Sequence, residues 1–112
     1  MNALVRGSVV WAELSPTQGR EHAGRRPALV VASRGYLAVA TTLAIVLPVT
    51  TTDRGWPNHV ALRGATGLDR PSWAMTEQPR TVARERVSQV VGIVDDDTLR
   101  DVGVWLRDFL DL

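Results

Sequence analysis

Residues 19–32 decide the fold: Gly-Arg-Glu-His-Ala-Gly-Arg-Arg-Pro-Ala-Leu-Val-Val-Ala, where a polar stretch changes abruptly into an apolar one. From Pro27 to Ala32 every side chain is apolar, which indicates a strand buried on both faces. The polar stretch belongs to a loop of about twelve residues that follows an earlier strand over 9–14. A loop this long and polar in so small a protein predicts a functional segment.

Short runs of branched apolar residues, separated by turn residues, continue along the rest of the chain. They predict strands over 9–14, 27–32, 43–50, 59–63, 72–75, 80–83 and 89–94. Pro48 cannot donate to a ladder, so it would place one strand end at a sheet edge or bulge. Behind Asp95-Asp96-Asp97-Thr98, apolar residues recur every three or four positions, which predicts a capped amphipathic helix of about fifteen residues. We expect a mainly β fold with a C-terminal α-helix.

Length and composition limit the kinds of protein that this chain can be. It has 112 residues, 45% of them hydrophobic, and no internal repeat, so we expect a single domain over 1–112. It has no cysteine, and His22 and His59 lie far apart, so we expect no disulfide and no metal site. No apolar run approaches the roughly 18 residues that span a bilayer, and there is no signal-peptide pattern. We therefore expect a cytoplasmic protein without a cofactor or a membrane partner.

The charges are unevenly distributed along the chain. Residues 1–94 carry eleven Arg and six acidic residues, a net +5, whereas residues 95–112 carry two Arg and six Asp, a net −4. Every basic residue is Arg, which suits phosphate recognition but also follows from a biased base composition of the gene. The basic body is thus compatible with nucleic-acid binding. We interpret the acidic tail as helix capping and a solvated face rather than as a binding tail.

Several motifs in a fixed order resemble the MazF/PemK toxin family over most of the chain. They are Arg6-Gly7 before a strand ending in Trp11, Leu14-Ser15-Pro16-Thr17, residues 19–27, Leu47-Pro48-Val49-Thr50, the stretch 67–72, Gln78-Pro79-Arg80-Thr81-Val82, and Gly92 before the final helix. The resemblance implies a small, strongly bent antiparallel SH3-like barrel of the MazF/CcdB/Kid type, usually a homodimer. It also implies a sequence-specific, metal-independent endoribonuclease for single-stranded RNA that a cognate MazE-like antitoxin neutralises.

Two other functions stay open. The first is a CcdB-like toxin that poisons gyrase by binding it, although such members lack the arginine and threonine that this chain has at Arg26 and Thr50. The second is a non-catalytic nucleic-acid-binding barrel, in which the arginines only bind phosphate.

Metal-free RNA cleavage needs a group that takes the 2′ proton, a group that protonates the leaving oxygen, and donors that stabilise the charged phosphate. The resemblance assigns Arg26 as the main catalytic arginine and Thr50 as a hydroxyl donor to a nonbridging oxygen. Glu21 is the preferred general base. His22 competes with it, because the family commonly has Gln at that position and histidine titrates near neutral pH. Glu21 and Arg26 would alternatively form only an ion pair that holds the loop.

A second set of residues is predicted to bind RNA through phosphate contacts, base edges and stacking. It comprises Arg25, Thr17, Gln18, Gln78, Arg80, Arg84, Arg86 and Trp56. Tyr36 is a further exposed-loop candidate for stacking. We expect Trp11, Trp73 and Trp105 in the core or a dimer interface, and we expect His59 to be structural.

Overall fold

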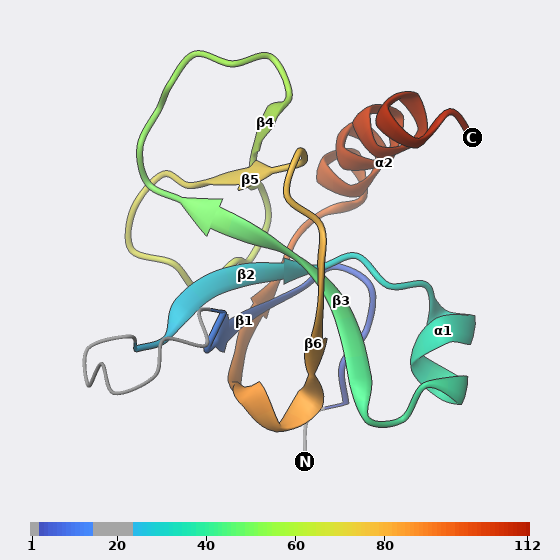
Figure 1. The fold of residues 1–112 in the computed structure, drawn as a ribbon. Helices are drawn as coiled ribbons and strands as arrows, with labels where there is room; N and C mark the ends of the chain where they lie inside the picture. The colour runs from blue at the N-terminus through green and yellow to red at the C-terminus, as the bar shows by residue number, and fades with distance from the viewer. Residues whose placement is uncertain (1–2, 15–23) are drawn as a thin grey trace.

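The computed structural model describes residues 3–14 and 24–112. Seven strands and two helices are joined by short connections (Figure 1). The strands are β1 (Ser8–Ala12), β2 (Arg26–Val30), β3 (Leu43–Thr50), β4 (His59–Ala61), β5 (Trp73–Met75), β6 (Arg80–Ala83) and β7 (Val87–Ile93). The helices are α1 (Arg34–Val39) and α2 (Asp96–Leu110), and a single 3₁₀ turn, η2 (Arg84–Arg86), links β6 to β7.

The strands form one antiparallel sheet in the order β4-β5-β3-β2-β1-β7, and β6 pairs with β3 outside this path. The first half of β3 pairs with β6 and its last two residues pair with β5, so the sheet divides into two parts at β3. β6 runs into β7 through η2, but the described residues contain no ladder between these two strands. The mainly β class is confirmed, whereas the expected closure into a barrel is not found in the described sheet.

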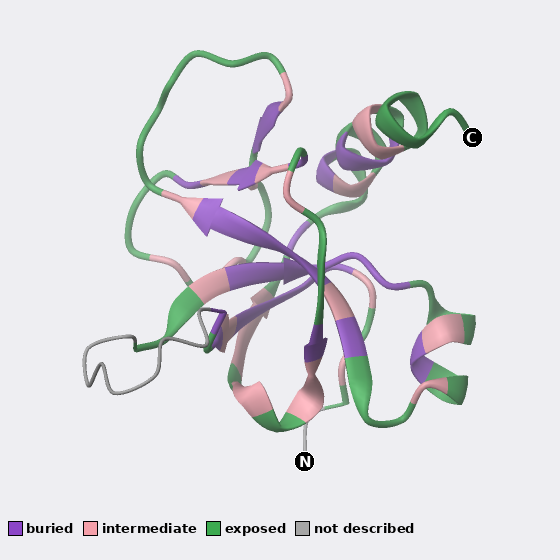
Figure 2. Ribbon diagram, viewed as in Figure 1, coloured by how far each residue is buried: buried purple, intermediate pink, exposed green. Residues whose placement is uncertain are grey.

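Each face of the sheet packs a separate core, because residues along a strand alternate between the faces. One core gathers residues such as Val10, Ala28 and Val46 under α1 and β6. The other gathers Leu29 and Leu47 with β4, β5 and residues of α2. The central strands β1, β2 and β3 are therefore buried on both sides, as Figure 2 shows by their purple segments. This confirms the prediction of a strand buried on both faces from Pro27 onward.

Pro48 lies inside the sheet, not at an edge as its sequence predicted. It pairs with Ala28 on one side of β3. On the other side, the β6 ladder ends at Val46 and the β5 ladder begins at Val49. The proline thus occupies the interval where β3 changes partners, and its missing N–H leaves no gap in a ladder.

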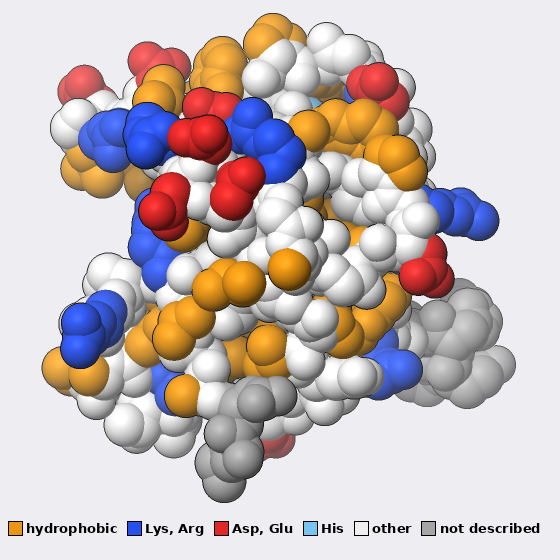
Figure 3. All heavy atoms as spheres, turned by 180° about the vertical axis from the view of Figure 1, so that it is seen from behind, with side chains coloured by type: hydrophobic (Ala, Val, Ile, Leu, Met, Phe, Trp, Pro, Cys, Tyr) orange, Lys and Arg blue, Asp and Glu red, His pale blue; other side chains and the backbone are white. Residues whose placement is uncertain are grey.

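The C-terminal helix forms as predicted and explains the acidic tail. Asp95 is its N-cap and accepts a hydrogen bond from the Thr98 N–H at 2.9 Å. Two further aspartates pair with arginines, Asp101 with Arg63 at 2.8 Å and Asp97 with Arg100. Figure 3 accordingly shows acidic and basic side chains intermingled over this part of the surface. The tail therefore caps and solvates the helix.

The short helix α1 was not predicted. It contains Tyr36, which was expected in a loop. Ser33 caps it by accepting a hydrogen bond from the Tyr36 N–H at 3.0 Å. Tyr36, expected in an exposed loop, lies on this helix and packs partly buried against the core under it. The expected exposed-loop position of Tyr36, on which its predicted stacking role rested, is therefore wrong. A six-residue helix carries too little periodicity to be recognised in a sequence.

Candidate functional site

Arg26 and Thr50 come from the adjacent ends of two central strands. The β2–β3 ladder pairs Ala28 with Pro48, and in an antiparallel ladder each step along one strand is a step back along the other. Arg26 and Thr50 therefore stand two residues beyond that pair on both strands. By alternation, both side chains point to the face that Ala28 and Pro48 share. The sequence placed these two residues at one site, and the register brings them together at one end of the sheet.

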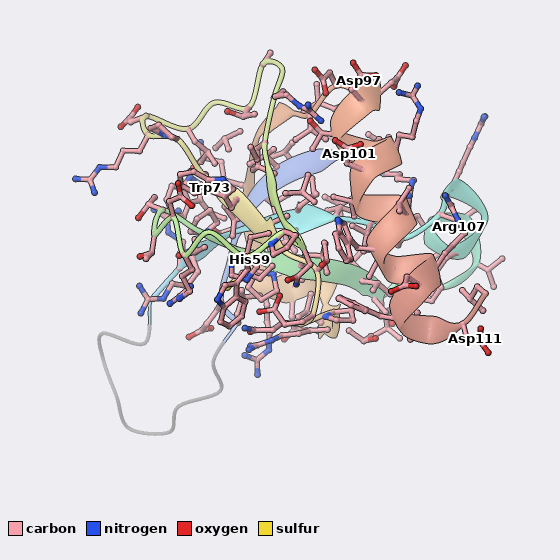
Figure 4. All side chains as sticks on the ribbon, turned by 90° about the horizontal axis from the view of Figure 1, so that it is seen from above. His59, Trp73, Asp97, Asp101, Arg107 and Asp111 are labelled. Carbon is pink, nitrogen blue, oxygen red and sulfur yellow. The ribbon has the colours of Figure 1, made fainter. Side chains whose placement is uncertain are left out.

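The same face continues across β5 and β4. Thr50 pairs with Trp73, and Met75 pairs with His59. The residues between them, Ala74 and Val60, belong to the core on the opposite face. We call the row formed by Arg26, Thr50, Trp73, Met75 and His59 the site face. Figure 4 shows His59 and Trp73 near one another, with the labelled α2 residues further away. Trp73, half-buried and expected in a core or dimer interface, is thus a direct neighbour of Thr50.

The Thr50 hydroxyl is held by a local turn. Its Oγ1 accepts a hydrogen bond from the Thr52 N–H at 3.1 Å. An accepting hydroxyl keeps its own proton free to donate. Arg26 is exposed at the start of β2, so its guanidinium and the Thr50 O–H are both available to an anionic ligand from solvent.

The loop before Arg26 carries the remaining predicted catalytic residues. Glu21 and His22, and with them the predicted RNA contacts Thr17 and Gln18, lie outside the described residues. Their roles stay predictions. The register places the two ends of this loop, Ala12 and Arg26, side by side on β1 and β2.

Arg25 lies beside Trp11 on the edge of the site. Its guanidinium carbon is 5.9 Å from the centre of the Trp11 ring, and its Nη1 donates to Ser88 Oγ at 3.4 Å. Ser88 in turn donates to the Trp11 carbonyl at 3.2 Å. Arg25 is exposed, so these contacts orient a cation that remains accessible to a phosphate.

Next to the site face, a polar network joins the segment before β4 to the segment after β5. His59 is only 7% exposed, and its Nε2 lies 3.1 Å from Glu77 Oε2. Asn58 Nδ2 donates to Glu77 Oε1 at 2.9 Å and to Thr76 Oγ1 at 3.2 Å, and Thr76 donates back to the Asn58 carbonyl at 2.7 Å. Gln78 Nε2 donates to Glu77 Oε2 at 3.3 Å. Glu77 is thus the centre of the network.

Glu77 is held in its ionised form. Desolvation opposes ionisation, but hydrogen bonds from its own backbone and from His59 and Gln78 outweigh it, so the pKa of Glu77 is lowered from its ordinary value. Trp56, 49% exposed, covers this network, with its ring centre 4.7 Å from that of His59. Sequence reasoning found Trp56 and Gln78 but missed Asn58, Thr76 and Glu77. A contact between residues eighteen positions apart leaves no local pattern in a sequence.

The three arginines of the β6–η2 segment differ in what they contact. Arg84 donates to the carbonyls of Leu43 at 2.8 Å, Leu37 at 2.5 Å and Ala40 at 3.2 Å, so its guanidinium binds the end of α1. Arg80 donates to the Leu14 carbonyl at 3.0 Å, two residues after the end of β1. Arg86, partly exposed, lies with Arg80 around a shallow hollow of about 230 Å³. Arg80 and Arg86 therefore lie near Glu13 and Leu14, whereas the contacts of Arg84 are with the protein's own backbone.

A larger groove, of about 990 Å³, lies away from Arg26 and Thr50, between the N-terminal segment, α1 and the first half of β7. In residues 3–14 and 24–112, no three His, Asp or Glu side chains gather closely enough to hold a metal ion. No helix in these ranges has the length and apolarity needed to cross a membrane.

Comparison with known proteins connects this geometry to a family. The family model of the PemK-like, MazF-like toxins of type II toxin–antitoxin systems matches residues 5–110. The endoribonuclease toxin MazF of Escherichia coli K12 is 33% identical over 95 residues, covering 84% of this chain and 82% of that protein. Endoribonuclease MazF6 of Mycobacterium tuberculosis is 34% identical over 112 residues, covering 97% and 98%.

Solved structures share the fold over the whole chain. MazF from Deinococcus radiodurans superposes with a TM-score of 0.81 at 28% identity, covering 100% of both chains. A chain of the MazE–MazF complex (form II) from the same organism gives a TM-score of 0.83 at 30% identity, covering 100% of this chain and 99% of that one. The order of strands and the final helix therefore match those of MazF proteins.

Proposed function

Since the chain belongs to the PemK-like, MazF-like toxins of type II toxin–antitoxin systems, we propose that it is an endoribonuclease toxin that cleaves single-stranded RNA at specific sequences without a metal ion. Relatives at 33% and 34% identity are named endoribonucleases. The observation that carries the proposal for this chain is the meeting of Arg26 and Thr50 on one sheet face, beside an exposed loop end.

The proposed reaction uses the RNA's own 2′-hydroxyl as the nucleophile. The 2′ oxygen attacks the adjacent phosphorus, the bond from phosphorus to the 5′ oxygen breaks, and the 2′ proton passes to a base. The departing 5′ oxygen takes up a proton from an acid. The products are a 2′,3′-cyclic phosphate and a 5′-hydroxyl end, so no water enters this step and no oxidant or metal is needed to balance it.

The proposed roles follow from the charge of each side chain and from whether it can donate or accept a proton. Arg26 would bind a nonbridging phosphate oxygen and stabilise the added negative charge, because arginine is a cation with several N–H donors and no acceptor. Thr50 would donate its free O–H to a second oxygen. Glu21 would take the 2′ proton, with His22 as the alternative. Arg25, Arg80 and Arg86 would contact neighbouring phosphates.

The partners are also proposed. Solved relatives include MazE–MazF complexes, which supports a MazE-like antitoxin as the neutralising partner of this chain. A homodimer would widen the site face into a groove long enough for several nucleotides. We also propose that residues 1–112 form a single domain and that the protein acts in the cytoplasm.

Purified protein incubated with a structure-free RNA in excess chelator tests the function. We expect cleavage at a restricted set of sites and fragments whose 5′ ends accept a labelled phosphate directly from a kinase, because they carry a hydroxyl. Arg26→Ala, purified in parallel, should abolish the fragments and excludes a contaminating nuclease.

Three outcomes would contradict parts of the proposal. Absence of cleavage across varied sequences would overturn the nuclease assignment and favour a CcdB-like or purely binding role. Cleavage that stops in chelator would overturn the metal-free mechanism. Fragments with 5′-phosphate ends would exclude attack by the 2′-hydroxyl.

A further inference from the structure

His59 is buried in a way that a purely structural side chain would not require. Its Nδ1 is buried and has no hydrogen-bond partner among the described residues. Buried polar atoms are nearly always paired, because an unpaired one loses its contacts with water without replacement. A phenylalanine would fill the same space and leave no such atom. We therefore look to the other ring nitrogen, Nε2, for the function of the imidazole at this position.

That other nitrogen acts on Glu77. The ionised carboxylate of Glu77 has only acceptors, so the hydrogen between the two groups lies on His59 Nε2, which donates across 3.1 Å. Glu77 Oε1 is taken by Asn58 and Oε2 by His59 and Gln78. With both oxygens engaged, Glu77 is a fixed acceptor that orients its neighbours.

The hydrogen bond to Glu77 fixes the orientation of the Gln78 side chain. Its Nε2 donates to Glu77 Oε2 and lies 3.7 Å from Met75 Sδ. The carbonyl Oε1 is therefore the atom of this amide left for a ligand, and it accepts hydrogen bonds. An accepting group is complementary to the amino groups of adenine, cytosine and guanine, whose hydrogens lie on the base edge.

The ring of His59 also supports Trp56, the second predicted RNA-binding residue of this segment. The Trp56 ring, half exposed, lies tilted at 45° over the imidazole with its centre 4.7 Å away. An indole supported from behind loses less freedom when a base stacks on its open side. One buried side chain thus contacts Trp56 directly and is linked to Gln78 through Glu77.

We infer that His59 is a positioning residue of the proposed nuclease, which holds Gln78 through Glu77 and supports Trp56 so that both bind RNA bases. The inference rests on the proposed function, and it assigns His59 to substrate binding rather than to the reacting phosphate. It lies on the site face with Arg26 and Thr50 but contacts neither in the described structure.

Three variants test this inference with oligoribonucleotides that contain one cleavage site. His59→Phe keeps the ring volume and removes both nitrogens, and His59→Gln keeps an N–H donor near the position of Nε2. Glu77→Ala removes the carboxylate that links His59 to Gln78. Because Glu77 is exposed, its truncation leaves no cavity in a core. For His59→Phe and Glu77→Ala we expect KM to rise about tenfold with kcat within about twofold of wild type, and His59→Gln to recover part of the loss. The thermal midpoint of His59→Phe should change little, since removal of the unpaired Nδ1 offsets the loss of the hydrogen bond to Glu77.

The base preference gives a second measurement. Substrates with adenosine, cytidine or guanosine replaced by purine riboside, 2-pyrimidinone riboside or inosine, respectively, lack the amino group. They should lose affinity for the wild type at one position and not for Glu77→Ala. Wild-type KM and base preference in His59→Phe and Glu77→Ala would overturn the inference. Equal losses of kcat and kcat/KM would also overturn it, because they would place His59 at the reaction itself. A wild-type protein that cleaves no RNA would instead refute the proposed function.

Discussion

Thr50 on β3 and Trp73 on β5 stand directly opposite one another in an antiparallel pair, so their side chains share one face of the sheet. The Thr50 oxygen also accepts the Thr52 N–H, which holds the hydroxyl in one orientation. An indole beside a hydroxyl excludes part of the water that would compete for its proton. The pair therefore gives the proposed phosphate site one dry side and one fixed donor.

Removing either proposed donor should abolish cleavage. Arg26→Ala and Thr50→Val should each lower kcat by about 10²–10³, the usual loss for one donor that stabilises transition-state charge. RNA binding, measured with a 2′-deoxy substrate analogue, should weaken much less. Arg100→Ala is the matched control, since Arg100 pairs with Asp97 on the exposed surface of α2. Near-normal activity of Arg26→Ala would show that the catalytic arginine is another one.

The general base should be identified by pH–rate profiles of Glu21→Gln and His22→Gln. A base must be deprotonated to act, so kcat/KM rises with pH through its pKa. We expect Glu21→Gln to lose this rising limb and His22→Gln to keep it. The reverse result would assign the proton transfer to His22, and two unchanged profiles would exclude both.

Arg84 should contribute to stability and not to RNA cleavage. Its guanidinium donates to three backbone carbonyls around the end of α1. Arg84→Ala should lower the free energy of unfolding by about 1–3 kcal/mol, because carbonyls that it satisfied lose a charged donor. Urea titration measures the loss, and kcat/KM under native conditions should stay near wild type. An equal substitution at Arg86 should show the opposite pattern, with weaker RNA binding and little change in stability.

Two glycines should respond in opposite directions to alanine. A Cβ at Gly92 would lie 2.3 Å from the Ala65 carbonyl oxygen, so Gly92→Ala should cost about 3 kcal/mol or more. Gly35 lies in α1, and a Cβ there meets nothing closer than Ser33 Oγ at 3.9 Å. Gly35→Ala should therefore stabilise the protein by about 0.5–1 kcal/mol. Thermal unfolding of the two variants compares the effects directly, and a stable Gly92→Ala would contradict the close packing of residues 64–67 against β7.

Glu77 should make the protein less stable in acid. Its pKa is lowered in the folded state, so as pH falls below the ordinary value of 4.5 the unfolded chain takes up the proton first. The contribution of Glu77 is complete above that pH and is lost as pH falls through the lower folded-state pKa. Unfolding free energies measured from neutral pH downward should decline more steeply for wild type than for Glu77→Gln. Glu85→Gln, an exposed glutamate on η2, is the control and should follow the wild-type slope.

The fold was largely predictable because its signals are local. Strands 43–50 and 80–83 match their predicted limits, the others agree within a few residues, and Asp95 caps the final helix as expected. The prediction from Pro48 was wrong, since a strand that changes partners is visible only in the paired sheet. For the same reason the sequence did not place Trp73 beside Thr50.

The structure places the residues of the predicted site, and their roles stay predictions. The family prediction is confirmed by the match over residues 5–110. Arg26 and Thr50 converge because a ladder aligns the ends of their strands, and that alignment was implicit in the motifs. Arg84 shows the limit of motif transfer, because a charge in the expected position is engaged by the protein's own backbone. His59 was expected to be structural, and its bond to Glu77, its unpaired Nδ1 and its contact with Trp56 become visible only in the structure.

In the proposed function, the placement of Arg26 and Thr50 on the central strands would separate chemistry from recognition. Both residues extend from strands that are buried on both faces, whereas Trp56 and Gln78 belong to connecting segments. Substitutions in the connections can therefore alter which RNA is preferred while the phosphate-binding pair keeps its register. Under the proposed function, such an arrangement would let related toxins differ in target while they keep the same catalytic pair, and the 51–58 and 76–79 segments would be the positions at which to engineer a new cleavage sequence.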